Sequence, residues 1–152
     1  LKKIKNIDFV WINYTNILNR KKKKRKMTKY KFSQEFPFKT SPKVLYNYIS
    51  TAGGLQQWFA EKVVMDNNHH FHFHWDSEVH VAELTSTRLN KSARFDFLGE
   101  NEGCFLEFKL ITSEIDNSVF LKVTDCSEIE DQDELETMWK SLIHDLKEIV
   151  GG

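Results

Sequence analysis

The strongest constraint on the fold of this chain is an amphipathic stretch near its end, residues 131–150. Its apolar side chains recur at steps of three and four residues, which predicts one apolar stripe along an α-helix. The stripe consists of Leu135, Met138, Trp139, Leu142, Ile143, Leu146, Ile149 and Val150. At about 1.5 Å per residue, the helix is roughly 30 Å long. A stripe this wide and this aromatic requires a sheet to lie against.

Signals at both ends support this helix. Asp131 and Glu134 are spaced as a capping box, in which Asp131 accepts hydrogen bonds from the free N–H groups of the first turn. Lys147 suits the negative end of the helix dipole, and Gly151 can end the helix.

Upstream, apolar and polar residues alternate in short runs, which predicts half-buried strands. Ser41-Pro42 is a helix-start signal, and Thr51-Ala52-Gly53-Gly54 is expected to break this helix. The segment LQQWFA that follows fits one or two helical turns. Strands are predicted over residues 30–38, 62–65, 69–76, 78–86, 92–98, 104–111 and 119–124. The turns between them are short, which favours antiparallel pairing. Helices set apart from a run of strands predict one α+β domain.

The two parts of the chain differ sharply in charge. Residues 1–26 contain ten Lys or Arg and one acid, a net charge of +9, whereas residues 27–152 contain twelve and twenty-one, a net charge of −9. An acidic domain is a poor match for nucleic acid or an anionic membrane. No apolar run reaches about 18 residues, so no membrane-spanning helix is predicted.

Residues 1–26 are rich in Lys, Asn and Ile and contain no Gly, Pro, Ala or Glu, a bias that translated AT-rich DNA would produce. We therefore expect a disordered basic extension that is not native coding sequence, with the natural start at Met27. The alternative is a basic tail for nucleic acid or nuclear import. The domain itself is predicted to span residues 27–152.

Four segments carry a family resemblance: the opening strand KYKFSQEFPF, the helix start TSPKVLYNYIS, the aromatic GGLQQWFA, and the ending VTDCSEIED with LETMWKSLIHDLK. Together they resemble the START-like, or helix-grip, superfamily, and within it the domains related to the C-terminal part of the heat-shock-protein ATPase activator. The resemblance covers residues 28–150 and rests on hydrophobic spacing rather than on a catalytic signature. It implies a curved antiparallel sheet of six to seven strands around the C-terminal helix, with two short helices after the first strand.

The resemblance also implies an apolar cavity between sheet and helix that holds a lipid or another small molecule. The residues expected to line it are Trp58, Phe59, Phe71, Phe73, Trp75, Phe95, Phe97, Leu106, Phe108, Met138, Trp139 and Ile143. The alternative is that these rings simply fill the core, because protein interiors pack at crystal-like density.

Five of the six histidines fall within residues 69–80. His70, His72 and His74 share one face of a predicted strand, and an H-x-H pair can bind zinc when a third ligand, such as His80, is near. No Cys or carboxylate stands at a confirming spacing. We therefore favour a partly exposed outer face without a metal.

No catalytic residue and no cofactor are predicted. Arg94 and Asp96 share one strand face, could form a polar cluster with Lys109 or Glu107, and are expected to take part in a solvated cross-strand ion pair. Asp125 is expected to finish the last strand. Cys104 and Cys126 form no C-x-x-C and lack a paired His and Asp, so reduced thiols are expected. The sequence contains no phosphate loop, G-x-S-x-G or H-E-x-x-H motif.

These features favour a small bacterial cytoplasmic protein that binds an apolar molecule or lipid without catalysis. One alternative is a protein-interaction module of the co-chaperone type, with a chaperone or another protein as partner; a homodimer is compatible with either function. The other is a cyclase- or hydrolase-like enzyme of the same superfamily. A closed, ring-filled interior favours the interaction module, an open apolar pocket favours ligand binding, and a buried pair of titratable groups favours an enzyme.

Overall fold

A computed structural model of the chain describes residues 28–152, so the expectation for residues 1–26 lies outside the described residues. In chain order the elements are β1 (Tyr30–Phe38), α2 (Pro42–Ser50), α3 (Ala52–Gln56), β2 (Lys62–Met65), β3 (His70–Trp75), β4 (Glu78–Arg88), β5 (Ser92–Phe97), η1 (Gly99–Asn101), β6 (Phe105–Thr112), β7 (Val119–Ser127) and α4 (Gln132–Val150). Within these residues, no helix combines the length and the apolar character needed to cross a membrane.

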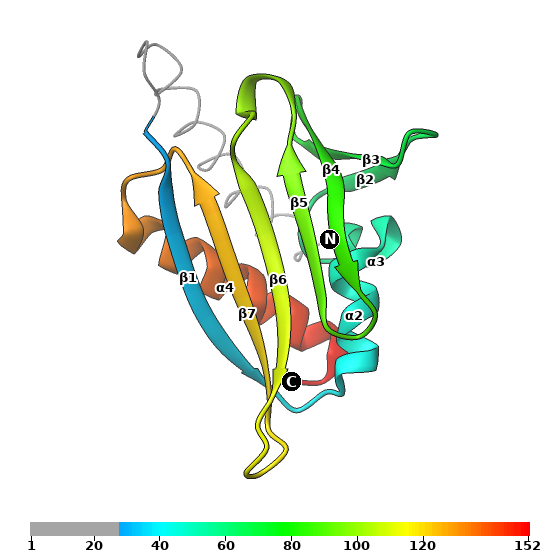
Figure 1. Ribbon diagram of the computed structural model, residues 1–152, viewed down its shortest axis with the longest axis vertical. Coiled ribbons are helices and arrows are strands. Elements are labelled where there is room, and N and C mark those ends of the chain that lie inside the picture. Colours follow the sequence, from blue (N-terminus) through cyan, green and yellow to red (C-terminus); the bar gives the residue numbers. More distant parts are fainter. Residues whose placement is uncertain (1–27) are drawn as a thin grey trace.

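The strands form one antiparallel seven-stranded sheet in the order β1-β7-β6-β5-β4-β3-β2. Strands β2 to β7 each pair with their neighbours in the chain, whereas β1 lies beside β7, as Figure 1 shows. The predicted α+β class, with six to seven strands around a C-terminal helix, is confirmed.

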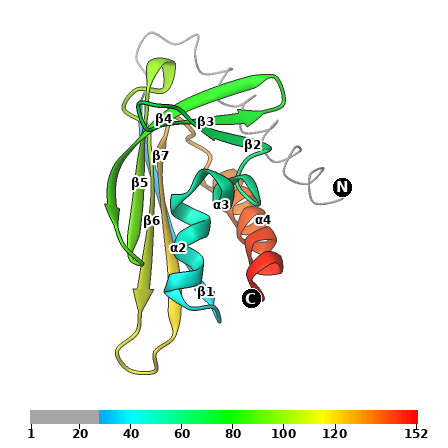
Figure 2. The ribbon, with the colours of Figure 1, turned by 90° about the vertical axis from the view of Figure 1, so that its right-hand side faces the viewer.

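The three helices lie on the same side of the sheet, and the β2–β3 hairpin bends over that side (Figure 2). The strand alternation explains this layering. In β3 the side chains of Phe71, Phe73 and Trp75 are buried, and the intervening histidines are only half-buried. Strands β1, β5, β6 and β7 likewise bury one face, so the sheet turns an apolar surface toward the helices and the core lies in this concave space.

The corner between α2 and α3 differs from the sequence prediction. The predicted break at Thr51-Ala52-Gly53-Gly54 does end α2 at Ser50, but only Thr51 is non-helical, and Ala52, Gly53 and Gly54 already belong to α3. The Thr51 hydroxyl accepts a hydrogen bond from Gly54 N at 3.0 Å. A Cβ on Gly54 would lie 2.0 Å from the Asn47 carbonyl oxygen, so only glycine allows α3 to pack this closely on α2.

Helix α4 has the predicted caps and the predicted buried stripe. Asp131 accepts from Glu134 N at 3.0 Å, and Gly151 ends the helix with a φ of 87°. The buried part of the stripe consists of Leu135, Met138, Trp139, Leu142, Ile143 and Leu146. The last two predicted members, Ile149 and Val150, are only partly buried.

Aromatic rings fill the space between the sheet and α4. Phe59 lies at the centre of this cluster: its ring centroid is 5.3 Å from that of Phe73, 5.6 Å from Trp75 and 6.0 Å from Trp139. Trp58 is buried too, and its indole N–H donates to the Tyr48 carbonyl oxygen at 2.8 Å. The interior is thus closely packed where these rings meet.

Candidate functional site

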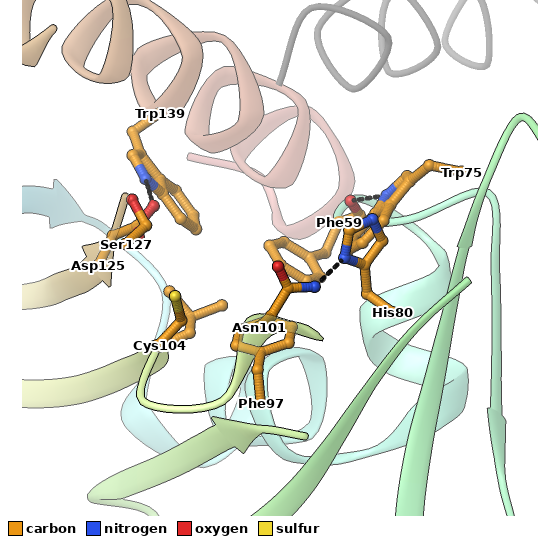
Figure 3. Close-up of a pocket in the computed structure, with 10 residues that line it drawn as sticks. Phe59, Trp75, His80, Phe97, Asn101, Cys104, Asp125, Ser127 and Trp139 are labelled. Carbon is orange, nitrogen blue, oxygen red and sulfur yellow. Dashed lines mark hydrogen bonds between the residues drawn. The ribbon is translucent and has the colours of Figure 1, made fainter. Parts of the chain in front are cut away.

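Two hollows adjoin each other near one end of the sheet. The first, the inner pocket, lies between the sheet and α4 and has a volume of about 20 Å³. Its lining residues, drawn in Figure 3, are Phe59, Trp75, His80, Phe97, Asn101, Cys104, Leu106, Asp125, Ser127 and Trp139. A volume of this size holds about one water molecule.

Five residues predicted from the sequence line this pocket: Phe59, Trp75, Phe97, Leu106 and Trp139. The other seven are buried in the packed core: Trp58, Phe71, Phe73, Phe95, Phe108, Met138 and Ile143. The structure therefore divides the predicted set into pocket walls and packing. The binding role of either group stays a prediction.

Asp125 supplies a carboxyl group to the inner pocket. It stands opposite Phe32 of β1 and Leu106 of β6, so it shares their inward face, and it is only 3% exposed. Trp139 Nε1 donates to Asp125 Oδ2 at 3.0 Å, and Ser127 also hydrogen-bonds to the carboxyl group. Burial raises the pKa of Asp125 to about 6, although the two hydrogen bonds favour the charged form.

A second polar pair, His80 and Asn101, stands on the other side of the pocket. His80 lies directly opposite Phe73 in the β3–β4 register, so its side chain points inward and is 5% exposed. Asn101 Nδ2 lies 2.8 Å from His80 Nδ1, and His80 Nε2 lies 3.3 Å from Glu78 Oε2. The Trp75 ring lies beside the imidazole, with the two centroids 5.3 Å apart.

The second hollow, the outer groove, lies on the far side of this pair. Its volume is about 470 Å³, and it is lined by Glu78, Val79, His80, Val81, Leu98, Gly99, Glu100 and Asn101. His80 and Asn101 line both hollows. These two side chains therefore stand between the inner pocket and the outer groove and form a partition.

The pocket holds one thiol, that of Cys104. Burial raises its pKa to about 11, so it is protonated near neutral pH and is a poor nucleophile. Nearby, Lys29 Nζ pairs with the buried carboxylate of Glu128 at 3.1 Å. Both cysteines are free: Phe105, next to Cys104, pairs with Cys126 in the ladder, which places the two thiols on opposite faces.

His70, His72 and His74 lie on the outer face of β3, as predicted. His72 Nε2 lies 2.9 Å from Asp66 Oδ2, and this hydrogen bond is the main cause that lowers the pKa of Asp66 to about 2. His80 faces the opposite side of the sheet and cannot complete a site with His72. No group of three His, Cys, Asp or Glu side chains within residues 28–152 is arranged to hold a metal ion.

Arg94 and Asp96 pair with each other along the outer face of β5, whereas the sequence predicted an ion pair across two strands. Arg94 Nε and Nη2 each donate to Asp96 at 3.0 Å, and the pairing lowers the pKa of the carboxyl group. The guanidinium also lies 3.8 Å from the centre of the Phe105 ring. The pair stands away from the inner pocket and stabilises the surface of the sheet.

The sequence reasoning missed the polar lining of the pocket: His80, Asn101, Cys104, Asp125 and Ser127. For Asp125 and Ser127 a signal was present, since extending the alternation of Val119, Leu121 and Val123 places both on the inward face of β7. For Asn101 no local pattern exists, because it lies in η1, whose position depends on how the β5–β6 turn folds.

Comparison with known proteins identifies relatives of the domain. The family model of the START-like superfamily domain matches residues 26–152. No curated protein sequence matches the chain. A solved structure from Bacteroides fragilis is 31% identical, with a TM-score of 0.57 and coverage of 81% of this chain and 92% of that one.

Two other solved structures are similar in fold. The solution structure of the Aha1 dimer from Colwellia psychrerythraea has a TM-score of 0.67 at 21% identity, covering 80% of this chain and 96% of that one. A protein from Bacillus halodurans has a TM-score of 0.63 at 19% identity, with 82% and 99% covered. At these identities the likeness concerns the fold alone.

Proposed function

We propose, because the chain belongs to the START-like superfamily, that this domain binds a small, mainly apolar molecule between its sheet and α4. The observation that carries the proposal is the Asp125 carboxyl group, which is buried on the wall of a ring-lined pocket. A carboxyl group in such a position lowers the stability of the folded protein, because burial disfavours its charged form. A functional role would explain why it is present. Binding the polar end of a ligand is such a role.

The size of the hollows supports a ligand that enters through the partition. The inner pocket holds about one water molecule. The outer groove, at about 470 Å³, falls within the range of roughly 300–1,000 Å³ typical of ligand sites. Breaking the Asn101–His80 hydrogen bond would join the two hollows at a cost of about 1 kcal/mol. Binding energy from a small molecule readily covers this cost.

The lining then divides into two roles. The aromatic and aliphatic walls, Phe59, Trp75, Phe97, Leu106 and Trp139, contact the apolar body of the ligand. Asp125 binds its polar end. No catalytic step is assigned, because the Cys104 thiol is protonated and Asp125 already accepts hydrogen bonds from Trp139 and Ser127. We expect the protein to act in the cytoplasm.

Native mass spectrometry of protein purified from its own host tests this function. We expect a fraction of the chains to carry one small organic molecule each. A Leu106→Phe variant, which adds a ring to the pocket wall, should lose the bound molecule. The matched control Leu110→Phe changes the same inward face of β6 outside the pocket and should retain it. If no bound molecule is found in the parent protein, and none is acquired from a host extract, the proposal fails.

A second candidate function is protein interaction of the co-chaperone type. The closed, ring-filled interior favours it, since a domain that only presents a surface needs no cavity. The fold shared with the Aha1 dimer agrees with this alternative, and a homodimer of this chain would be compatible with it. Stimulation of a bacterial heat-shock ATPase by the purified protein would support it, and an unchanged ATPase rate at saturating protein would exclude it.

A further inference from the structure

The polar side chains of the inner pocket indicate which chemical class of ligand it binds. Two of its walls carry polar side chains that belong to no catalytic or metal arrangement: Asp125 on β7, and Asn101 in η1 with its partner His80. What each of these groups can offer a ligand follows from the hydrogen bonds it already makes.

The orientation of the Asn101 amide follows from Glu78. A carboxylate only accepts, so His80 Nε2, 3.3 Å from Glu78 Oε2, must carry the proton. In the neutral imidazole, Nδ1 is then an acceptor, and the group 2.8 Å from it must be the Asn101 NH₂. The amide oxygen consequently points the other way. Figure 3 shows it turned from His80 toward the interior of the pocket.

The pocket therefore presents hydrogen-bond acceptors from two walls. Within residues 28–152, no hydrogen bond engages the Asn101 side-chain oxygen. The Asp125 carboxyl group accepts from Trp139 and Ser127, which uses two of its roughly four lone-pair sites. The remaining capacity of both groups suits a ligand atom that donates several hydrogen bonds and accepts none.

The surrounding rings and charges favour the same chemistry. The rings of Phe59, Trp75, Phe97 and Trp139 line the site, and the faces of aromatic rings attract a cation. The outer groove, through which a ligand would pass, carries two further carboxylates, Glu78 and Glu100. Negative charge along an approach path raises the local concentration of cations.

We propose that the inner pocket binds the ammonium group of a primary amine, with Asp125 and Asn101 Oδ1 as acceptors and the rings around its alkyl or aryl chain. This inference rests on the proposed function and specifies the class of its ligand. Asp125 supplies the negative charge, and the chain of the amine extends through the opened partition into the outer groove. Opening the partition breaks the Asn101–His80 hydrogen bond, and the ammonium group then takes the place of His80 as the partner of the Asn101 side chain, through Oδ1.

A series of three ligands of equal length tests the inference: butylammonium, butan-1-ol and butanoate, added at pH 7 and constant ionic strength. The indole Nε1–H resonance of Trp139 reports binding, because this group donates directly to Asp125. Butylammonium should bind about tenfold more tightly than butan-1-ol, a difference of one decade in Kd. Butanoate should leave the resonance unmoved.

Variants of two aspartates separate charge from shape. Asp125→Asn keeps an acceptor for Trp139 but removes the charge, so the preference for butylammonium over butan-1-ol should disappear. The matched control Asp96→Asn changes a carboxylate on the outer face of the sheet and should leave the preference intact.

The outcomes distinguish this inference from the proposed function. Equal or tighter binding of butan-1-ol in the parent protein overturns the ammonium assignment while a small-molecule site remains. A preference that survives in Asp125→Asn overturns the role of Asp125. If none of the three ligands moves the Trp139 resonance, the amine inference is overturned, and host-purified protein that also lacks a bound molecule overturns the proposed function as well.

Discussion

The two ends of the interior are equally buried but differ in what holds them together. At one end, the rings of Phe71, Phe73 and Phe95 contact one another, and packing alone accounts for them. At the other end, Asp125 and His80 are as deeply buried, yet each must satisfy its polar atoms through specific partners. The first end stabilises the fold, whereas the second lowers stability and is therefore the better candidate for function.

The largest effect is expected at the ring-packed end. Phe73→Ala removes the ring that contacts Phe59, Phe71, Trp75 and Phe95 and leaves a cavity, which should lower the free energy of unfolding by about 3–5 kcal/mol. Urea denaturation measures it. The control Phe105→Ala, on the half-buried outer face of β6, should cost far less. Similar losses in both variants would remove the distinction between core and surface rings.

At the polar end, substitution of the buried carboxyl group should raise the free energy of unfolding at neutral pH. The pKa of Asp125 rises from 3.8 to about 6 on folding, so the native state holds the proton more tightly than the unfolded state. Its contribution to stability is fully present below pH 3.8 and is lost as pH rises through 6. The shift corresponds to roughly 3 kcal/mol at neutral pH. Asp125→Asn should recover most of this amount at pH 7 and almost none at pH 3.5.

An exposed carboxyl group provides the control for this pH dependence. The pKa of Asp116 is lowered by hydrogen bonds from Ser118, so its contribution has the opposite sign and is lost as pH falls. Asp116→Asn should therefore not stabilise the protein at pH 7. If Asp125→Asn is destabilising at pH 7, the hydrogen bonds to the carboxylate outweigh the cost of its burial. The polar end would then stabilise the fold, as the ring-packed end does.

The corner between α2 and α3, which positions the buried Trp58, should show an intermediate effect. Gly54→Ala places a methyl group against the α2 backbone and should cost about 1–3 kcal/mol, as overpacking does. At Gly53, where a Cβ meets nothing within 4 Å, the same change should be neutral or stabilising. Thermal unfolding of the two variants gives the comparison. Equal melting temperatures would show that the corner adjusts without affecting the rings.

The smallest effect is expected at the partition. Asn101→Ala removes one hydrogen bond and should lower stability by only about 1 kcal/mol. In the parent protein, the nitrogen resonances of His80 should show a protonated Nε2 and an unprotonated Nδ1. A protonated Nδ1 would mean that the Asn101 amide is reversed and that its oxygen does not face the pocket.

The two ends also differ in how far they could be predicted from the sequence. Alternation within β3 and the helical spacing of α4 placed Phe73, Trp75 and Trp139 on inward faces, because burial of apolar rings is a strong local signal. The same alternation, continued past Val123, would have placed Asp125 inward. The expectation that Asp125 merely ends β7 missed this, since the strand runs on to Ser127.

The partition could not be predicted, for a physical reason. His80 and Asn101 are 21 residues apart and meet only because β4 and the β5–β6 turn lie side by side in the folded sheet. No spacing rule encodes a contact of this kind, which depends on the register of several strands. The helical conformation of Gly53 and Gly54 could not be predicted either, because it depends on the close packing of α3 against the backbone of α2.

The central claim is that the fold buries the ionisable carboxyl group of Asp125 in the wall of the inner pocket and that this burial lowers the stability of the protein at neutral pH. The most direct test is an NMR titration of its carboxyl carbon in the ligand-free protein. The account predicts a pKa of about 6, with the Trp139 indole resonance following the same curve. A pKa at or below the ordinary value of 3.8 would contradict it, because the carboxylate would then be solvated or fully compensated.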